Sequence, residues 1–357
     1  MKTSVLLVGD SSSRHVERLA AALAERGIDG AVAAFEPREL ALPLHRLGHL
    51  AAEDDRRYAL AVPALMRLIR RLRPRVVHAH YLSSYGVLAA IATRVLGAFH
   101  MRSHALVQSV WGSDILVTPQ RSRGMARLAR FALESADVVT GDSDELRDST
   151  RALTRQPIPW HGFIFGPPSA LFGIGRSDSG LSFVSPRALL DTMRIDTVIE
   201  AFVEARKVAP LQDATLHVCG SGIAGEGLRS RYESTSGVQF RSEVTTRELH
   251  ELLGASRSFV SIPRSDGTSA SLLEGMALGC VPIVNSLPAN LQWVDDSTGV
   301  IVSRDPTVTE LASAFVRAAT APFDIEAVRA AVRGACWEDQ VDGLVRLYDR
   351  LPTGRHV

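Results

Sequence analysis

Short apolar runs alternate along the whole chain with segments whose apolar residues recur at helical spacing, and this alternation constrains the fold most strongly. The first example is Val5 to Val8, followed by the loop GDSSS and by Val16 to Arg26, where Leu19 and Leu23 share one helix face. A short, continuous apolar run suits a strand that is buried on both faces of a sheet. The repetition therefore predicts an α/β fold with doubly wound parallel sheets.

The alternation occurs in two series, separated by a stretch of different composition. Further strands are expected at Val76 to Ala79, Leu106 to Val110, Val138 to Thr140, Leu181 to Val184, Thr215 to Cys219, Phe259 to Ile262 and Val281 to Val284. Residues 157–180 are dense in Gly and Pro, which predicts an interdomain linker. We expect an N-terminal domain over 1–165, a C-terminal domain over 166–336, and a last helix, 337–351, that packs back on the first domain.

Length, charge and cysteine content narrow the class of protein. A chain of 357 residues suits two cores, and a net charge of +1 gives no global attraction to nucleic acid. Three widely spaced cysteines fit neither a zinc site nor a disulfide framework, and the amino-terminal apolar run is too short for a signal peptide or membrane span. These features lead us to expect a cytoplasmic protein.

Two segments combine arginine with apolar residues, MRLIRRLRPR and RSRGMARLAR. Such segments occur in helices that lie on membranes. Neither one has the exposed aromatic anchors expected of such a helix, so we interpret both as solvated helix faces and disfavour contact with a membrane surface.

The stretch DGTSASLLEGMALGCVP, residues 266–282, predicts a loop that leads from a strand into a short helix. Ser269 is the expected N-cap, and Gly279 marks the end of the helix. The backbone amides of Gly267, Thr268 and Ser269 then lie at a helix N-terminus, which favours a phosphate or sugar oxygen.

Glu274 is the only charged residue of this short helix, among small and apolar neighbours. A buried carboxylate requires hydrogen-bond donors, and the two vicinal hydroxyls of a ribose would supply them. The alternative is that Glu274 points to solvent.

The segment IPRSDGTSASLLEGMALGCVPIVNSLPANLQWV resembles the signature segment of family 4 glycosyltransferases, which are retaining enzymes of the GT-B fold that use nucleoside-diphosphate sugars. Other segments resemble the family in the same order along the chain. They are VVHAHYLSSYG, SVWGSDIL, ADVVTGDSDEL, SPRALLDTMRIDTVIEAF, VCGSGIAGEGL and the closing helix.

The resemblance implies a set of donor-binding residues. Asp266 would lie near the transferred sugar and Glu274 on the ribose, while Arg187 matches the family's phosphate arginine. The lysine that usually follows falls at Met193 here, and the neighbouring Arg194 is a candidate substitute. Alternatively, Arg194 is a solvated helix residue. Ser12, Ser13 and Val244 complete the expected donor contacts.

Gly220, Gly222 and Gly225 spell GxGxxG after a strand, which on its own predicts an NAD-dependent oxidoreductase. The run lies in mid-chain, GEGL does not open a helix cleanly, and Glu243 matches the expected ribose acid only loosely. The resemblance assigns this loop instead to the phosphates or sugar of the donor.

Acceptor-binding residues are expected in the N-terminal domain. His78 and His80 share one strand face, and His80, nearer the loop, is the candidate for contact with acceptor or donor sugar; the alternative is a hydrogen-bonded structural histidine. Trp111 stands where the family often has histidine, which suggests a stacking surface. The expected acceptor contacts are His80, Tyr81, Ser83, Ser84, Trp111 and Asp114.

Asp142, Ser143 and Asp144 form a DxD triplet, a manganese motif in another glycosyltransferase fold, but here helix capping by Ser143 is the better interpretation. We therefore expect a metal-independent reaction with no cofactor, in which Asp266, Arg187 and His80 are the catalytic candidates. UDP is the favoured nucleotide, and a glycan or small natural product is the expected acceptor. A non-catalytic nucleotide-sugar binder remains open, because Met193, Trp111 and Pro168 depart from the family pattern.

Overall fold

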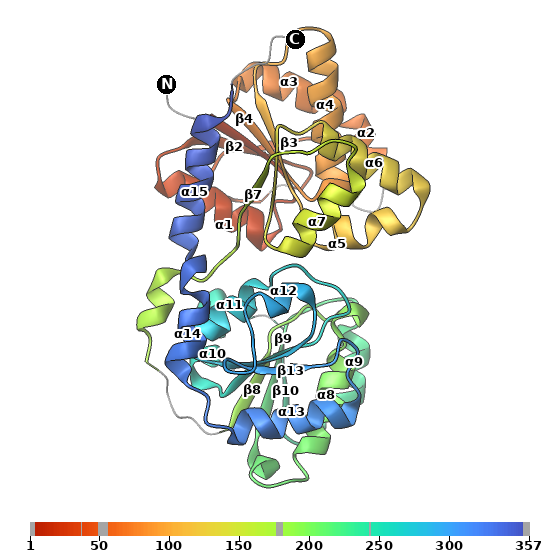
Figure 1. Cartoon of the computed structure of the whole chain (residues 1–357). Helices are drawn as coiled ribbons and strands as arrows, with labels where there is room; N and C mark the ends of the chain where they lie inside the picture. Colours follow the sequence, from red (N-terminus) through yellow and green to blue (C-terminus); the bar gives the residue numbers. More distant parts are fainter. Residues whose placement is uncertain (1–3, 37, 49–55, 176–180, 243, 353–357) are drawn as a thin grey trace. The chain divides into compact units, whose positions relative to one another are not determined.

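The computed structural model describes residues 4–36, 38–48, 56–175, 181–242 and 244–352 (Figure 1). The chain forms two compact units. Unit 1 comprises Met1–Ile164 and Asp339–Val357, and unit 2 comprises Phe165–Glu338. The break after Ile164 lies next to the expected domain boundary, and most of the last helix belongs with unit 1.

Unit 1 contains a seven-stranded sheet with the order β3-β2-β1-β4-β5-β6-β7, in which every neighbouring pair is parallel. The strands are β1 (Ser4–Val8), β2 (Asp29–Ala34), β3 (Leu44–Arg46), β4 (Val76–His80), β5 (Ala105–Ser109), β6 (Val138–Gly141) and β7 (Trp160–Gly162). The helices are α1 (Arg14–Glu25), α2 (Arg56–Leu60), α3 (Val62–Leu72), α4 (Val87–Ala98), α5 (Ser113–Leu116), α6 (Arg123–Glu134), α7 (Asp144–Leu153) and α15 (Trp337–Arg350).

Unit 2 contains a six-stranded parallel sheet with the order β10-β9-β8-β11-β12-β13. The strands are β8 (Ser182–Ser185), β9 (Thr215–Cys219), β10 (Val238–Arg241), β11 (Ser258–Ser261), β12 (Val281–Asn285) and β13 (Val300–Val302). The helices are α8 (Ile195–Ala205), α9 (Gly225–Tyr232), α10 (Thr246–Ala255), α11 (Ala270–Ala277), α12 (Pro288–Leu291), α13 (Val308–Thr320) and α14 (Ile325–Val332).

The apolar strands and the apolar faces of the helices form one core in each unit, which confirms the doubly wound α/β prediction. Leu6, Val77 and Leu106 are fully buried in unit 1, and Phe183 and Val260 are fully buried in unit 2. Strands buried on both faces need no alternation of polar and apolar residues, which is why the predicted strands are continuous apolar runs.

Local capping chemistry fixes several helix ends. Thr245 and Glu248 form a reciprocal capping box at the start of α10. The Ser143 hydroxyl accepts a hydrogen bond from the Leu146 amide at the start of α7, which confirms the capping interpretation of the DxD triplet.

Some elements differ from the expectations. Strand β7 lies within the expected linker and pairs with β6, with Val139 opposite Trp160. It was missed because a three-residue edge strand leaves little apolar pattern among Pro and Gly. Most of the second arginine-rich segment, residues 121–130, lies in α6, where Leu128 is 47% exposed. Phe131, the residue directly after the segment, is 36% exposed. Among the described residues, no helix is both long and apolar enough to span a membrane.

Both strand orders reverse direction at one point, between β1 and β4 in unit 1 and between β8 and β11 in unit 2. Ligands of open parallel sheets bind beyond the carboxyl ends of the strands at such a point. The loops that follow these four strands are therefore the first places to search for a functional site.

Candidate active site

Arg187 and the loop of residues 264–269 follow β8 and β11, so both lie at the reversal point of the unit 2 sheet. The Arg187 guanidinium forms an ion pair with Asp266 and donates a hydrogen bond to the Ser269 hydroxyl. Its side chain is 11% exposed and that of Asp266 is 23% exposed. The structure thus brings together three of the predicted donor residues in one partly buried cluster.

The same cluster contains the N-terminus of α11. Ser269 is its N-cap, as predicted, and its hydroxyl accepts a hydrogen bond from the Leu272 amide. Gly279, beyond the end of α11, has a φ of 87°, a left-handed conformation that ends the helix as predicted. Gly267 is buried and Thr268 is half-buried, and the Trp293 indole donates to the Thr268 hydroxyl over 3.4 Å. A cation and a helix N-terminus therefore adjoin, a combination that favours a bound anion.

Glu274 lies on α11, the helix that Ser269 caps, and is only 8% exposed, so the solvent-facing alternative is wrong. Its carboxylate lies 3.2 Å from Nε2 of His250, which comes from α10. Sequence reasoning missed His250, because nothing in the α10 pattern distinguishes an inward-facing histidine from a solvated one. The carboxylate is held by a neighbouring side chain where a ribose had been expected to supply the donors.

Arg194 was expected either to replace the phosphate lysine or to be a solvated helix residue, and its environment fits neither expectation. The residue is 5% exposed, so it is not a solvated helix residue. Its guanidinium donates to the carbonyls of Ile262 at 2.7 Å and Arg304 at 2.7 Å, and to the Asp305 carboxylate at 2.8 Å. Through these bonds the side chain links the loops after β11 and β13. Its donors are used within the protein, so it does not take the place of a phosphate lysine. At the lysine position itself, the Met193 sulfur accepts a 3.4 Å hydrogen bond from Arg187.

The glycine loop after β9 lies against the loop that carries Arg187. Gly220 and Gly222 have φ values of 145° and 159°. A Cβ atom added to either would lie 2.4 Å from the Arg187 carbonyl oxygen or 2.3 Å from that of Leu189. Only glycine permits this close approach of two backbones. The loop borders a pocket of about 480 Å³ lined also by Ser221, Arg229 and Ser242, while Val244 is half-buried beyond β10.

The strand order disfavours the alternative of an NAD-dependent oxidoreductase that uses the Gly220 loop. Contrary to expectation, α9 does begin at Gly225, the last glycine of the run. However, β9 lies one strand away from the reversal point, and a dinucleotide fingerprint follows the strand at that point. Glu243 lies outside the described residues.

In unit 1, the serines of the loop after β1 form hydrogen bonds within the protein. The hydroxyl and the amide of Ser12 both donate to the Asp10 carboxylate, at 2.8 and 2.9 Å. Ser13 is the N-cap of α1 but makes no side-chain capping bond. Ser11 is fully buried and donates to the Glu36 carbonyl. Ser12 and Ser13, the two predicted donor residues of this unit, follow β1 and so lie at the reversal point of the unit 1 sheet. Their contact with the donor stays a prediction.

His78 and His80 both point into the interior from β4, with ring centroids 4.3 Å apart. His78 is a structural histidine, because its ring nitrogens bond to Tyr348 at 2.5 Å and to Ser109 at 2.7 Å. His80 is 1% exposed, and within the described parts of the chain neither of its ring nitrogens has a hydrogen-bond partner. Burial lowers the pKa of His80 to about 3 and holds the pKa of His78 well below its usual range, so both rings are neutral.

The remaining predicted acceptor residues differ in their contacts, and Trp111 is the one with a ring contact to His80. The Trp111 ring lies 5.4 Å from that of His80. The Tyr81 hydroxyl bonds to Ser113 at 2.8 Å, and Ser83 and Ser84 lie in a π-helical turn, Leu82–Gly86. Tyr81 has a φ of 72°, an uncommon conformation for a bulky residue and a form of strain found at functional sites.

Asp114 is not an acceptor-side carboxylate. It is fully buried, and its oxygens accept hydrogen bonds from the amides of Leu82 at 2.8 Å and of Trp111 and Gly112 at 3.0 Å each. Burial raises the pKa of Asp114, and these backbone donors counteract the rise. The side chain fixes the two loops that carry Tyr81 and Trp111, so it positions the expected site without reaching a ligand.

A metal site would require several ligating side chains close together. No group of three or more His, Cys, Asp or Glu side chains there is arranged to hold a metal ion.

Comparisons with known proteins agree with this architecture. Residues 4–143 match the family described as "Glycosyl transferase 4-like", and residues 182–321 match "Glycosyl transferases group 1". The search of curated proteins finds no match.

Solved structures share the fold at low sequence identity. A sucrose-phosphate synthase from Thermosynechococcus elongatus is 16% identical, with a TM-score of 0.76 over 98% of this chain and 99% of that one. The Anabaena protein Alr3699/HepE, solved with UDP and glucose, is 13% identical, with a TM-score of 0.78 over 97% and 99%. A glycosyltransferase from Rickettsia africae is 12% identical, with a TM-score of 0.73 over 98% of each chain. The two parallel-sheet units, their family matches and these shared folds identify the chain as a glycosyltransferase of the GT-B fold.

Proposed function

We propose that this enzyme moves a sugar from a nucleoside diphosphate, preferentially uridine diphosphate, to a hydroxyl group of a glycan or small natural product. The reaction proceeds with retention of the anomeric configuration and without a metal ion. The observation that carries the proposal is the position of Arg187, which contacts Asp266 and Ser269 at the N-terminus of α11. Preorganised donors at this point match the charge that develops on a departing diphosphate.

The ion pair between Arg187 and Asp266 gives the donor site two states. Without donor, the carboxylate neutralises the guanidinium. A bound diphosphate carries more negative charge than Asp266, and it displaces this carboxylate from the guanidinium. Asp266 is then free to accept hydrogen bonds from hydroxyls of the sugar.

Other parts of the proposed donor site are the Gly220 loop and Glu274. The closely packed glycines bring the two backbones together beside Arg187. Glu274 binds the ribose diol, and His250 holds the carboxylate in place. The Anabaena protein has been solved with UDP, with UDP and glucose, and with UDP-glucose, which supports the choice of nucleotide.

On the acceptor side, His80 is the proposed contact. A neutral imidazole at the reversal point, with two unpartnered nitrogens among the described residues, can donate one hydrogen bond to a sugar oxygen and accept one. Trp111 lies beside it, and Tyr81, Ser83 and Ser84 follow His80 directly in the chain.

A screen of nucleoside diphosphates by thermal shift tests the proposal. Tight binding of the product raises the melting temperature by mass action, and we expect UDP to give the largest rise. Sugar release from the matching nucleotide sugar then separates an enzyme from a non-catalytic binder. A melting temperature raised by NADH but by no nucleoside diphosphate would overturn the proposal in favour of an oxidoreductase.

A further inference from the structure

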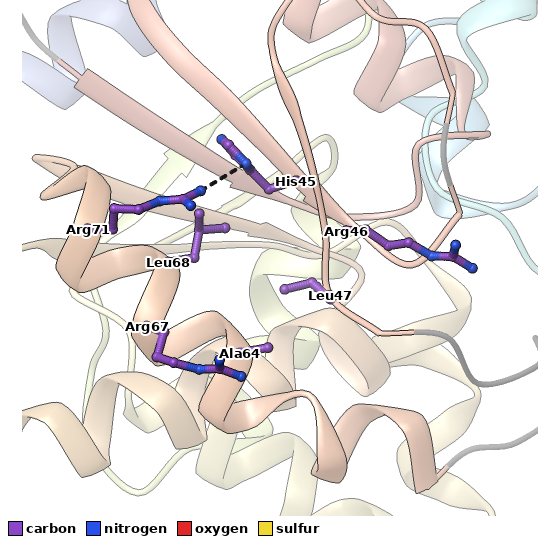
Figure 2. Close-up of a pocket in the computed structure, with 7 residues that line it drawn as sticks. All are labelled: His45, Arg46, Leu47, Ala64, Arg67, Leu68 and Arg71. Carbon is purple, nitrogen blue, oxygen red and sulfur yellow. Dashed lines mark hydrogen bonds between the residues drawn. The ribbon is translucent and has the colours of Figure 1, made fainter.

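A second pocket, of about 420 Å³, lies in unit 1 at the edge of the sheet (Figure 2). It is lined by His45, Arg46, Leu47, Ala64, Arg67, Leu68 and Arg71, from β3 and the residue after it and from α3. Strand β3 is the outermost strand, separated by β2 from the β1–β4 reversal point. The pocket is therefore distinct from the loops that form the candidate active site.

The polar groups that line this pocket are cationic or hydrogen-bond donating, and its described lining contains no carboxylate. Arg67 and Arg71 are four residues apart on α3, a spacing that places them side by side on the helix surface. Two like charges at this spacing destabilise a helix unless an anion lies between them. No ion pair or hydrogen bond to a carboxylate involves either side chain within the described part of the chain.

The facing strand orients one of these guanidiniums. Figure 2 shows the side chains of His45 and Arg71 pointing toward one another, with Nδ1 of His45 3.2 Å from the Arg71 guanidinium. Arginine can only donate, so Nδ1 accepts and the neutral His45 ring carries its proton on Nε2. The ring thus holds Arg71 in place and retains one donor of its own.

The other two arginines differ in how their donors are used. Nε of Arg67 donates to the Pro63 carbonyl at 3.3 Å, which leaves its two terminal nitrogens available. Arg46 points away from Arg67, Arg71 and His45 (Figure 2), and its Nε donates to the carbonyls of Phe35 and Gly48. The available donors therefore belong to Arg67, Arg71 and His45.

We propose that Arg67, Arg71 and His45 form a binding site for a phosphate monoester group. Two guanidinium forks match the oxygens of a phosphate, and a dianion compensates the two positive charges that the protein leaves unpaired there. The phosphate belongs either to a soluble metabolite or to the headgroup of a lipid. Leu68 and Leu47 give the pocket an apolar floor that suits the carbon skeleton next to the phosphate.

Isothermal titration of the full chain with glycerol 3-phosphate, at low ionic strength, tests this site. We expect saturable binding to wild-type protein and a loss of about tenfold or more in affinity for Arg67→Ser/Arg71→Ser. Arg67→Lys/Arg71→Lys, which keeps the charge but loses the forks, is expected between the two. Since the side chains of Arg67 and Arg71 are exposed, each variant is expected to fold like wild type. Its melting temperature verifies this.

The matched control is Arg123→Ser/Arg127→Ser, which removes two exposed arginines at the same spacing from α6. It is expected to bind glycerol 3-phosphate like wild type, as is Arg187→Ala, whose altered site lies in unit 2. The inference is therefore independent of the proposed function. Equal affinity of the Arg67→Ser/Arg71→Ser variant and wild type would overturn it.

Vesicles distinguish the source of the phosphate. If the group is carried by a lipid, wild-type protein sediments with phosphatidylcholine vesicles that contain phosphatidic acid, and the Arg67→Ser/Arg71→Ser variant stays in the supernatant. If it is carried by a metabolite, only the soluble probe binds. Absence of saturable binding to both probes would eliminate the site.

Discussion

At the residue scale, the function depends on a few side chains whose environment decides their role. Arg187 and Arg194 are both arginines that follow β8, yet one contacts Asp266 at a helix N-terminus and the other is committed to backbone carbonyls. His78 and His80 share a strand face, yet only His78 has hydrogen-bond partners among the described residues. Residue type and spacing predicted the candidates, and the partners of each side chain show which of them have structural roles.

The first prediction concerns Asp266. Asp266→Asn removes the charge that neutralises Arg187, so the guanidinium becomes more attractive to a diphosphate. We expect UDP to bind several-fold more tightly while sugar transfer falls by about tenfold or more, because the sugar loses its carboxylate contact. Calorimetry and a transfer assay measure the two effects, and weaker UDP binding in this variant would contradict the two-state donor site.

The second prediction concerns Glu274. Glu274→Gln removes the carboxylate that is expected to accept from the ribose, at a cost of about 1–3 kcal/mol in UDP binding. Titration with 2′-deoxy-UDP provides the control, since wild type is expected to bind it more weakly than UDP whereas the variant discriminates less. Equal discrimination by both proteins would exclude the ribose role.

At the element scale, the sequence predicted most of the central strands and the helix that carries the candidate site. The apolar runs of β1, β4, β8 and β11 and the caps of α11 agree with the structure. Strand β2 and the edge strands β3, β7, β10 and β13 were missed. Strand β2 reads DGAVAA, in which small residues give little apolar signal, and the edge strands have only three or four residues each. The contact of Asp114 with Leu82 and the contacts of Arg194 were also unpredictable, since they form with loops distant in sequence.

The third prediction concerns Arg194 as a structural residue. Arg194→Ala leaves the carbonyls of Ile262 and Arg304 without their donor, so we expect a loss of about 2–4 kcal/mol in the free energy of unfolding. The matched control is Arg264→Ala, because Arg264 lies 3.9 Å from the same Asp305 carboxylate but is 64% exposed, and its loss is expected within about 0.5 kcal/mol. Urea unfolding measures both. Normal stability of Arg194→Ala combined with lost UDP affinity would restore the donor-binding role.

At the scale of the whole molecule, buried neutral histidines link stability to pH. Burial lowers the pKa values of His80 and His104 to about 3 and that of His217 to about 4, while His78 is also lowered. An unfolded histidine has a pKa near 6.5, so below that pH the unfolded state binds more protons than the folded state. The raised pKa of Asp114 acts in the opposite direction, but it is a single group against four.

The fourth prediction follows from these signs. As pH falls from about 6.5 toward 5, the free energy of unfolding is expected to fall by about 1.4 kcal/mol per pH unit for each such histidine. His104→Gln removes one of them and should flatten the decline, whereas His100→Gln, at an exposed position of the same loop, should not. Urea unfolding at several pH values measures the slopes. A stability that rises on acidification in this range would show that the histidines are not buried as the structure has them.

The central claim is that Arg187 meets the diphosphate of the sugar donor, and one measurement tests it most directly. Arg187→Ala is expected to lower kcat for sugar transfer by the equivalent of about 2–4 kcal/mol of barrier, while the free energy of unfolding changes little. A transfer assay with the nucleotide sugar selected by the thermal-shift screen provides the value, and urea unfolding provides the control. An Arg187→Ala enzyme with near wild-type kcat would contradict the account.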